Sequence, residues 1–193
     1  MRCVSSCHAL TSLKLSLYPR GRDDYTKTLF PKSLNFPLLT TLDLENFAFC
    51  GSENACAEPF SAFTKLNSLV ISNCEVKDAQ ILNISSETLL NLALHDNSTD
   101  FAKIELSAPS LCTFTFTGDL LQKIYGSSLS SIKQGTIDAQ DVLYSEDSAM
   151  VLLSLLQDLA NVESLAVTST TLQVPCHVFK LYLYFLLKMH FLF

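Results

Sequence analysis

The chain has 193 residues, 48% hydrophobic and 17% charged, a composition that can bury a core and excludes intrinsic disorder. Its net charge is −6 and its basic residues are scattered singly, which excludes nucleic acid and anionic membranes as expected partners. Seven irregularly spaced cysteines, with no secretory signal peptide ahead of them, predict reduced thiols and a cytoplasmic or nuclear protein.

A motif of regularly spaced leucines begins near the N-terminus and recurs along the chain. It is clearest in "LNSLVISNC", residues 66–74, and "LLNLALHDN", residues 89–97, which share the L-x-x-L-x-L-x-x-N/C pattern of a leucine-rich repeat. Further units are predicted to begin at Leu10, Leu39, Leu111 and Val162, with a weaker one at Leu129 in "LSSIKQGTID". The units are spaced by 18 to 33 residues, so the repeat is irregular.

Each unit predicts one short strand whose apolar side chains face a core that only stacked neighbours can close. We therefore predict an α/β leucine-rich-repeat solenoid of about seven repeats over residues 1–173, in preference to an unrelated α/β domain. A curved parallel sheet would form the concave side, and loops and short helices the convex side. Cys74 and Asn97 are expected where the chain leaves the strand, and the Asn97 amide is expected to bond backbone groups of the turn.

Helical signals are few. The segment "SEDSAMVLLSLLQDLAN", residues 145–161, predicts a helix, because Ser145 can cap it and its leucines recur along one face. A shorter helical turn is expected after Pro59. Both are expected to pack on the convex side, where phenylalanines such as Phe47 and Phe49 would fill the core.

The last twenty residues, 174–193, form a divergent apolar tail that abandons the repeat spacing. Their longest uninterrupted apolar run, residues 181–187, lies between Lys180 and Lys188 and is shorter than the roughly 20 residues of a bilayer span. We interpret the tail as the end of a truncated or misspliced product. A tail-anchored membrane protein is the alternative, and membrane association is not expected.

No catalytic constellation is found in the sequence. There is no nucleophile elbow, glycine-rich phosphate loop or zinc-protease motif, and the four histidines are isolated. The cysteine pairs in "CVSSCH" and "CGSENAC" lack a second pair at metal-binding spacing. The sequence therefore predicts a protein that is not an enzyme and that uses no cofactor and no metal.

The residues that alternate with the inward leucines should form the concave surface of the sheet. Charge on an otherwise small, polar surface can select a partner, so Asp43, Glu45, Lys14 and His95 are the most distinctive of them. A solvated strand face without a partner is the alternative for each position. The candidate partner-binding residues are Lys14, Asp43, Glu45, Ser68, Ser72, Asn91, His95, Thr113, Thr115 and Thr168.

The phrases around the repeats resemble a known family. "FPKSLNFPLLTTLDLENFAFC", "EPFSAFTKLNSLVISNC", "LSAPSLCTFTFTGD" and "LLSLLQDLANVESLAVTS" resemble, in that order, the leucine-rich region of plant F-box/LRR proteins, many of which also carry an FBD segment. The resemblance covers residues 1 to about 173. It implies repeats that select a protein target, while an F-box recruits the Skp-type adaptor of a cullin ubiquitin ligase.

This resemblance predicts a protein–protein interaction module, similar to the substrate-recognition repeats of an F-box-type ubiquitin-ligase adaptor. The sequence ahead of Leu10 is too short for an F-box, so binding of the Skp-type adaptor is not expected. A truncated or degenerate relative without a ligase role is the alternative. The identity of the protein target is not predicted.

Overall fold

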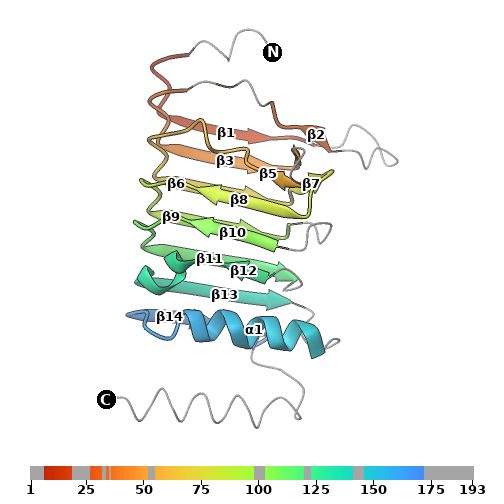
Figure 1. Cartoon of the computed structure of the whole chain (residues 1–193), viewed down its shortest axis with the longest axis vertical. Coiled ribbons are helices and arrows are strands. Elements are labelled where there is room, and N and C mark those ends of the chain that lie inside the picture. Colours follow the sequence, from red (N-terminus) through yellow and green to blue (C-terminus); the bar gives the residue numbers. More distant parts are fainter. Residues whose placement is uncertain are drawn as a thin grey trace.

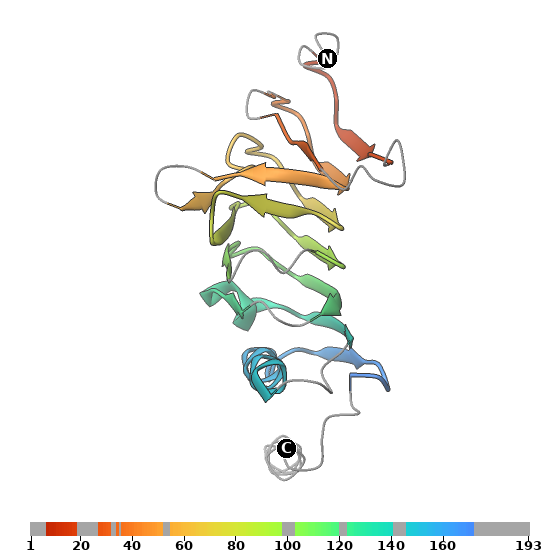
Figure 2. The same cartoon turned by 90° about the vertical axis from the view of Figure 1, so that its right-hand side faces the viewer.

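The computed structural model describes residues 7–18, 27–31, 34, 36–51, 55–97, 103–119, 123–140 and 146–171. In these residues the chain is a β-solenoid, in which short parallel strands stack level upon level from the N-terminal to the C-terminal end (Figure 1). The same stack is visible in Figure 2, which is turned by 90° and shows the α-helix α1 (Glu146–Asp158) end-on. The predicted solenoid is therefore confirmed.

One seven-stranded parallel sheet contains a strand from each predicted unit. Its spatial order follows the chain order, so every strand pairs with the strand of the preceding unit. Short connections of this kind build a parallel sheet by simple stacking. The strands are, in order, β1 (Ser12–Ser16), β3 (Thr41–Glu45), β6 (Ser68–Ser72), β9 (Asn91–His95), β11 (Thr113–Asp119), β13 (Gln134–Gln140) and β14 (Ser164–Val167).

The rest of the solenoid differs from the expected loops and short helices, because further parallel sheets occupy much of it. One sheet has the order β12 (Lys123–Tyr125), β10 (Lys103–Ser107), β8 (Ile81–Ser85) and β5 (Cys56–Ala57). The other has the order β2 (Thr28–Leu29), β4 (Phe47–Cys50) and β7 (Glu75–Lys77). Helical structure in the described ranges is limited to the 3₁₀ helix η1 (Ser127–Ser131) and the α-helix α1 (Glu146–Asp158).

The core is built from rungs of inward side chains. Leu42, Leu69, Leu92 and Phe114 align across four neighbouring strands and are at most 2% exposed. This alignment removes each leucine from water only when its neighbours are in place, which is why single repeats do not fold alone. Phenylalanines extend the core as expected: Phe47 and Phe49 are both about 1% exposed and pack edge-to-face on Phe30.

The sixth unit begins three residues later than predicted. The amide of Ile132 donates to the carbonyl oxygen of Leu129, just as the amide of Leu111 donates to that of Ala108. The register of β11 and β13 supports this starting point, because Phe114 pairs with Gly135 and Phe116 with Ile137. Ile132 is therefore the first position of the unit, and Gly135 occupies the place of the next leucine.

The helix α1 confirms the predicted amphipathic segment. Its Leu152, Leu155 and Leu156 are buried at 0–3% exposure, as is Leu159, one residue beyond the end of the helix. Its expected cap, Ser145, lies outside the described residues, as does the apolar tail 174–193. The helical turn expected after Pro59 is instead a hydrogen-bonded turn, in which the amide of Phe63 donates to the carbonyl oxygen of Phe60 at 3.0 Å.

Candidate functional site

The outward side chains of the seven-stranded sheet form one polar surface, here called the outer face, in three register-aligned rows. In the first row every residue carries a hydroxyl or an amide, and Thr113 donates to the side-chain oxygen of Asn91 at 2.6 Å. Because most of these polar side chains are short, they project little from the sheet and leave its surface accessible. The row consists of Ser12, Thr41, Ser68, Asn91, Thr113, Gln134 and Ser164.

The second row contains the ion pair of the face. Lys14 Nζ lies 2.6 Å from Asp43 Oδ2, and this hydrogen bond raises the pKa of Lys14. The Lys14 side chain is 70% exposed, so water screens the pair and it contributes little to stability. The other members are small: Val70, Ala93, Thr115, Thr136 and Ala166.

The third row runs along the edge of the face where the chain turns away. Glu45, Ser72 and His95 are half-buried neighbours on successive strands. Further along, Thr168, one residue beyond β14, donates to Asp138 Oδ1 at 2.7 Å. The row consists of Ser16, Glu45, Ser72, His95, Thr117, Asp138 and Thr168.

The structure brings all ten candidate residues to this face or its rim. It adds three that the sequence did not indicate, namely Gln134, Thr136 and Asp138, which align with Thr113, Thr115 and Thr117. These three were missed because the sixth unit was placed three residues too early. The alternation of polar residues around Gly135 and Ile137 was the signal that could have identified them.

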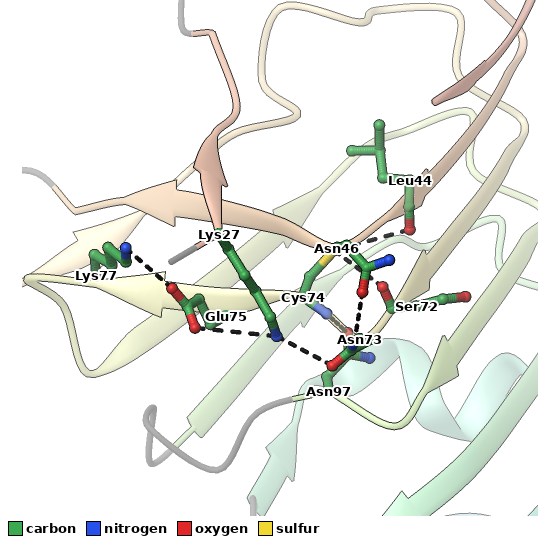
Figure 3. Close-up of polar contacts among 9 residues, drawn as sticks. All are labelled: Lys27, Leu44, Asn46, Ser72, Asn73, Cys74, Glu75, Lys77 and Asn97. Atoms are coloured by element: carbon green, nitrogen blue, oxygen red, sulfur yellow. Dashed lines mark hydrogen bonds and ion pairs between the residues drawn. The ribbon is translucent and has the colours of Figure 1, made fainter. Parts of the chain in front are cut away.

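Asparagine and aspartate hold the corner where the strands end. Asn46, Asn73 and Asp96 have φ angles of 65°, 47° and 47°, a left-handed conformation that Asn and Asp tolerate better than other side chains. Asn73 Nδ2 donates to Asn46 Oδ1 at 2.5 Å (Figure 3). Asn46 Nδ2 in turn donates to the carbonyl oxygen of Leu17 at 2.6 Å. These bonds connect successive levels beside the third row.

A cluster of charges ties the three-stranded sheet to this corner (Figure 3). Lys27 Nζ donates to Asn73 Oδ1 at 3.1 Å and lies 4.0 Å from Glu75 Oε2, and Lys77 Nζ lies 3.2 Å from Glu75 Oε1. Lys27 and Glu75 side chains are only 17% and 15% exposed. Each charged group already has a partner of opposite charge, so the cluster stabilises the fold and offers no open binding position.

The corner positions of Cys74 and Asn97 are also confirmed. Asn97 Nδ2 donates to the carbonyl oxygen of Ile71 at 3.0 Å, and Asn97 Oδ1 accepts the amide of Cys74 at 2.9 Å. The expected role of the Asn97 amide in bonding turn backbone is therefore observed. Cys74 itself is buried, at 1% exposure.

Two cavities lie away from the outer face. One, of about 240 Å³, is lined by Phe30, Phe49, Cys50, Cys56 and Glu58 among others. The other, of about 220 Å³, lies between β12 and α1. Cysteines 50, 74 and 112 are free thiols. Among the residues that the structure describes, no three His, Cys, Asp or Glu side chains are grouped to hold a metal ion.

Comparison of the chain with protein-family models, curated proteins and solved structures gave no significant match. The structure therefore defines the class of the protein, a parallel β-solenoid, through its strand topology alone. None of the helices in the described ranges has the length and apolar character needed to cross a membrane. The tail 174–193, on which the tail-anchored alternative depends, is not among these ranges.

Proposed function

We propose that this chain is a protein-interaction module that binds a protein target through the outer face of the seven-stranded sheet. The observation that carries the proposal is the register of the sheet, which aligns polar side chains from seven strands into one continuous surface. Solenoids commonly use such extended sheet surfaces to bind partners. The outward side chains remain half-buried or exposed and are available for contact.

We also propose that the repeating units are leucine-rich repeats. Two features support this: Leu or Ile fills the inward motif positions at Leu69, Ile71, Leu92 and Leu94, and Asn or Cys stands at the corner that follows. With the resemblance to plant F-box/LRR proteins, this leads to a more specific proposal. The chain would act as the substrate-recognition repeats of an F-box-type ubiquitin-ligase adaptor.

The charges of the outer face favour a basic target. Asp43 is paired with Lys14, whereas Glu45 and Asp138 form no ion pair with a described residue. A target that presents Lys or Arg would therefore find complementary charge at two separate positions of the third row, Glu45 and Asp138. Trp, Tyr and Arg, which dominate binding hot spots, are missing from the three rows, so we expect the target to supply the large anchoring side chains.

Charge reversal on the outer face tests the proposal. The double variant Asp43→Lys/Glu45→Lys is compared with Glu87→Lys/Glu163→Lys, which changes the net charge equally at exposed sites outside the three rows. Proximity labelling in plant cells, followed by reciprocal pull-down, should identify partners lost only with the first variant. Equal capture of every partner by both variants and the wild type would exclude this face as the binding site.

The ligase part of the proposal needs its own experiment. A target of the outer face that is degraded by the proteasome should accumulate when the double variant replaces the wild type, while Glu87→Lys/Glu163→Lys should leave its level unchanged. If the wild type binds the target but the double variant leaves the target level unchanged, the alternative is favoured, namely a relative without a ligase role. Co-precipitation of the Skp-type adaptor at stoichiometric level would contradict that alternative.

A further inference from the structure

The cavity of about 240 Å³ lies where β4 ends and β5 begins. Phe49 and Cys50 line it from the end of β4, and Cys56 lines it from β5. Ligands of drug size need pockets of about 300–1,000 Å³, so a cavity of this volume accepts a smaller molecule. Because the cavity lies away from the outer face, such a ligand would not compete with a protein target bound there.

The apolar part of the lining is held in place by ring contacts. Phe30 and Phe49 both line the cavity, are 5% and 1% exposed, and pack edge-to-face with ring centroids 5.9 Å apart. Phe60 in turn packs on Phe49, with ring centroids 5.4 Å apart. These rings are ordered before a ligand arrives, so little side-chain ordering opposes binding. Aromatic residues also suit a cationic ligand, because the faces of their rings attract positive charge.

Glu58, an exposed residue, supplies a negative charge to the lining. Asn83 Nδ2 donates to Glu58 Oε1 at 3.1 Å, which orients the carboxylate. The amide of Asn83 carries no charge, and Glu58 forms no ion pair with a described residue. The charge of the carboxylate is therefore left to attract a cation.

The groups around Glu58 do not neutralise it. Burial raises the pKa of the Cys56 thiol, and the carboxylates of Glu58 and Glu105 raise it further, so the thiol is uncharged at neutral pH. Lys77, on the strand beside β4, lies 3.2 Å from Glu75 Oε1 and is held by that carboxylate. Among the described residues that line the cavity there is no Lys or Arg. The lining therefore combines an apolar wall with one negative charge.

We propose that this cavity binds a small organic cation, in which an ammonium group is carried on an apolar body. The ammonium group lies at the Glu58 carboxylate, and the apolar body lies against Phe30 and Phe49. An anion of the same size would be repelled by the carboxylate, and a neutral molecule would gain no charge pairing. The proposal does not depend on the function proposed for the outer face.

A fluorinated amine tests this site in the full chain. The probe is para-fluorophenethylammonium chloride, and its binding is followed by the broadening of its fluorine NMR signal. The neutral control is para-fluorophenylethanol, which has the same body with a hydroxyl in place of the ammonium group. The amine should bind about tenfold or more tightly than the alcohol, because a hydrogen bond between two charged groups is stronger than one with a neutral donor.

A first pair of variants tests the charge. Glu58→Gln keeps the shape of the side chain and an oxygen that can accept from Asn83, but it removes the negative charge. It should weaken binding of the amine by about tenfold or more. The matched control is Glu87→Gln, which removes the same charge at an exposed turn outside the cavity and should bind as the wild type does. Equal weakening by both variants would show unspecific attraction to an acidic chain and overturn the proposal.

A second pair of variants tests the cavity itself. Ala62 is exposed and lines the cavity, so Ala62→Leu should fill part of it and weaken binding by about tenfold or more without a change of charge. The matched control is Ala9→Leu, at an exposed turn residue that does not line the cavity. Unchanged binding to Ala62→Leu would place the probe elsewhere and overturn the proposal. So would equal binding of the amine and the alcohol, or no binding of the amine at millimolar concentration.

Discussion

Cys74 and Asn97 occupy the same corner in successive levels of the solenoid and make equivalent contacts to the level before. Asn97 Nδ2 lies 3.0 Å from the carbonyl oxygen of Ile71, and Cys74 Sγ lies 3.8 Å from that of Leu44, which pairs with Ile71 in the sheet. Only the amide also accepts a bond, from the backbone N–H of Cys74. This shared contact explains how Cys74 and Asn97 can stand at the same motif position, and the additional accepted bond makes Asn97 the stronger connector.

The first prediction concerns Asn97. The substitution Asn97→Ala removes the acceptor of the Cys74 amide and the donor to the Ile71 carbonyl, so it should lower the free energy of unfolding by about 1–3 kcal/mol. Urea denaturation measures the change. The control is Asn91→Ala on the outer face, which should change stability by about 0.5 kcal/mol or less. Equal losses in the two variants would show that the corner bonds add no stability.

The second prediction concerns pH. Burial raises the pKa of the Cys74 thiol from 9.0 to about 11. The folded chain therefore holds this proton more tightly than the unfolded chain, so the stabilisation is complete below pH 9.0 and is lost as the pH rises towards 11. A shift of this size corresponds to about 2–3 kcal/mol.

The stabilities of the wild type and Cys74→Ala should be compared across this pH range. Tyrosines and lysines titrate in both proteins, so the difference between the two curves isolates Cys74. We expect the stability advantage of the wild type to shrink between pH 9.0 and about 11. A constant difference over the whole range would contradict the raised pKa of the thiol.

Much of the main sheet could be predicted from the sequence, because its inward positions are occupied by large apolar residues at fixed spacing. Leu69 and Ile71 are good examples, since each is paired with its counterpart in the next unit and is at most 1% exposed. The alternation rule then places the polar neighbours Ser68 and Ser72 on the outer face. Most of the candidate residues followed directly from this rule.

The remaining features could not be predicted for identifiable reasons. The strands of the two smaller sheets have two to five residues and lie outside the leucine motif, so the spacing that marks the main sheet does not extend to them. The sixth unit was misplaced because Gly135 stands where a leucine was expected, and Leu165 of the next level fills its space. The cavity between β12 and α1 depends on residues about thirty positions apart, which only the fold brings together.

The third prediction contrasts two glycines. Gly126 has φ 153°, and a Cβ atom there would lie 2.0 Å from the backbone oxygen of Leu106. Gly126→Ala should therefore lower the free energy of unfolding by about 1–3 kcal/mol or more. Neither the φ angle of residue 126 nor the backbone of Leu106 can adapt without strain. A Cβ atom at Gly135 would instead meet the terminal Cδ1 of Leu165 at 2.8 Å, and this side chain is only partly buried.

Gly135→Ala should accordingly cost only about 1 kcal/mol, since Leu165 can change its rotamer. Thermal and urea denaturation of the two variants beside the wild type measures this difference. Gly126→Ala is expected to be clearly the less stable of the two. The reverse order would show that the close approach of Gly126 to Leu106 is not a constraint of the fold.

The fourth prediction concerns Thr171, which is fully buried and joins the last described turn to β13. Its Oγ1 accepts the amide of Ala139 at 2.7 Å and lies 3.2 Å from the Ala139 carbonyl oxygen. Thr171→Val keeps the shape but leaves the buried amide of Ala139 unsatisfied, so it should cost about 1–3 kcal/mol in unfolding free energy. Thr171→Ser keeps the hydroxyl and should recover part of this loss. The matched control is Thr170→Val at the exposed neighbour, and a loss as large as that of Thr171→Val would contradict the specific role of Thr171.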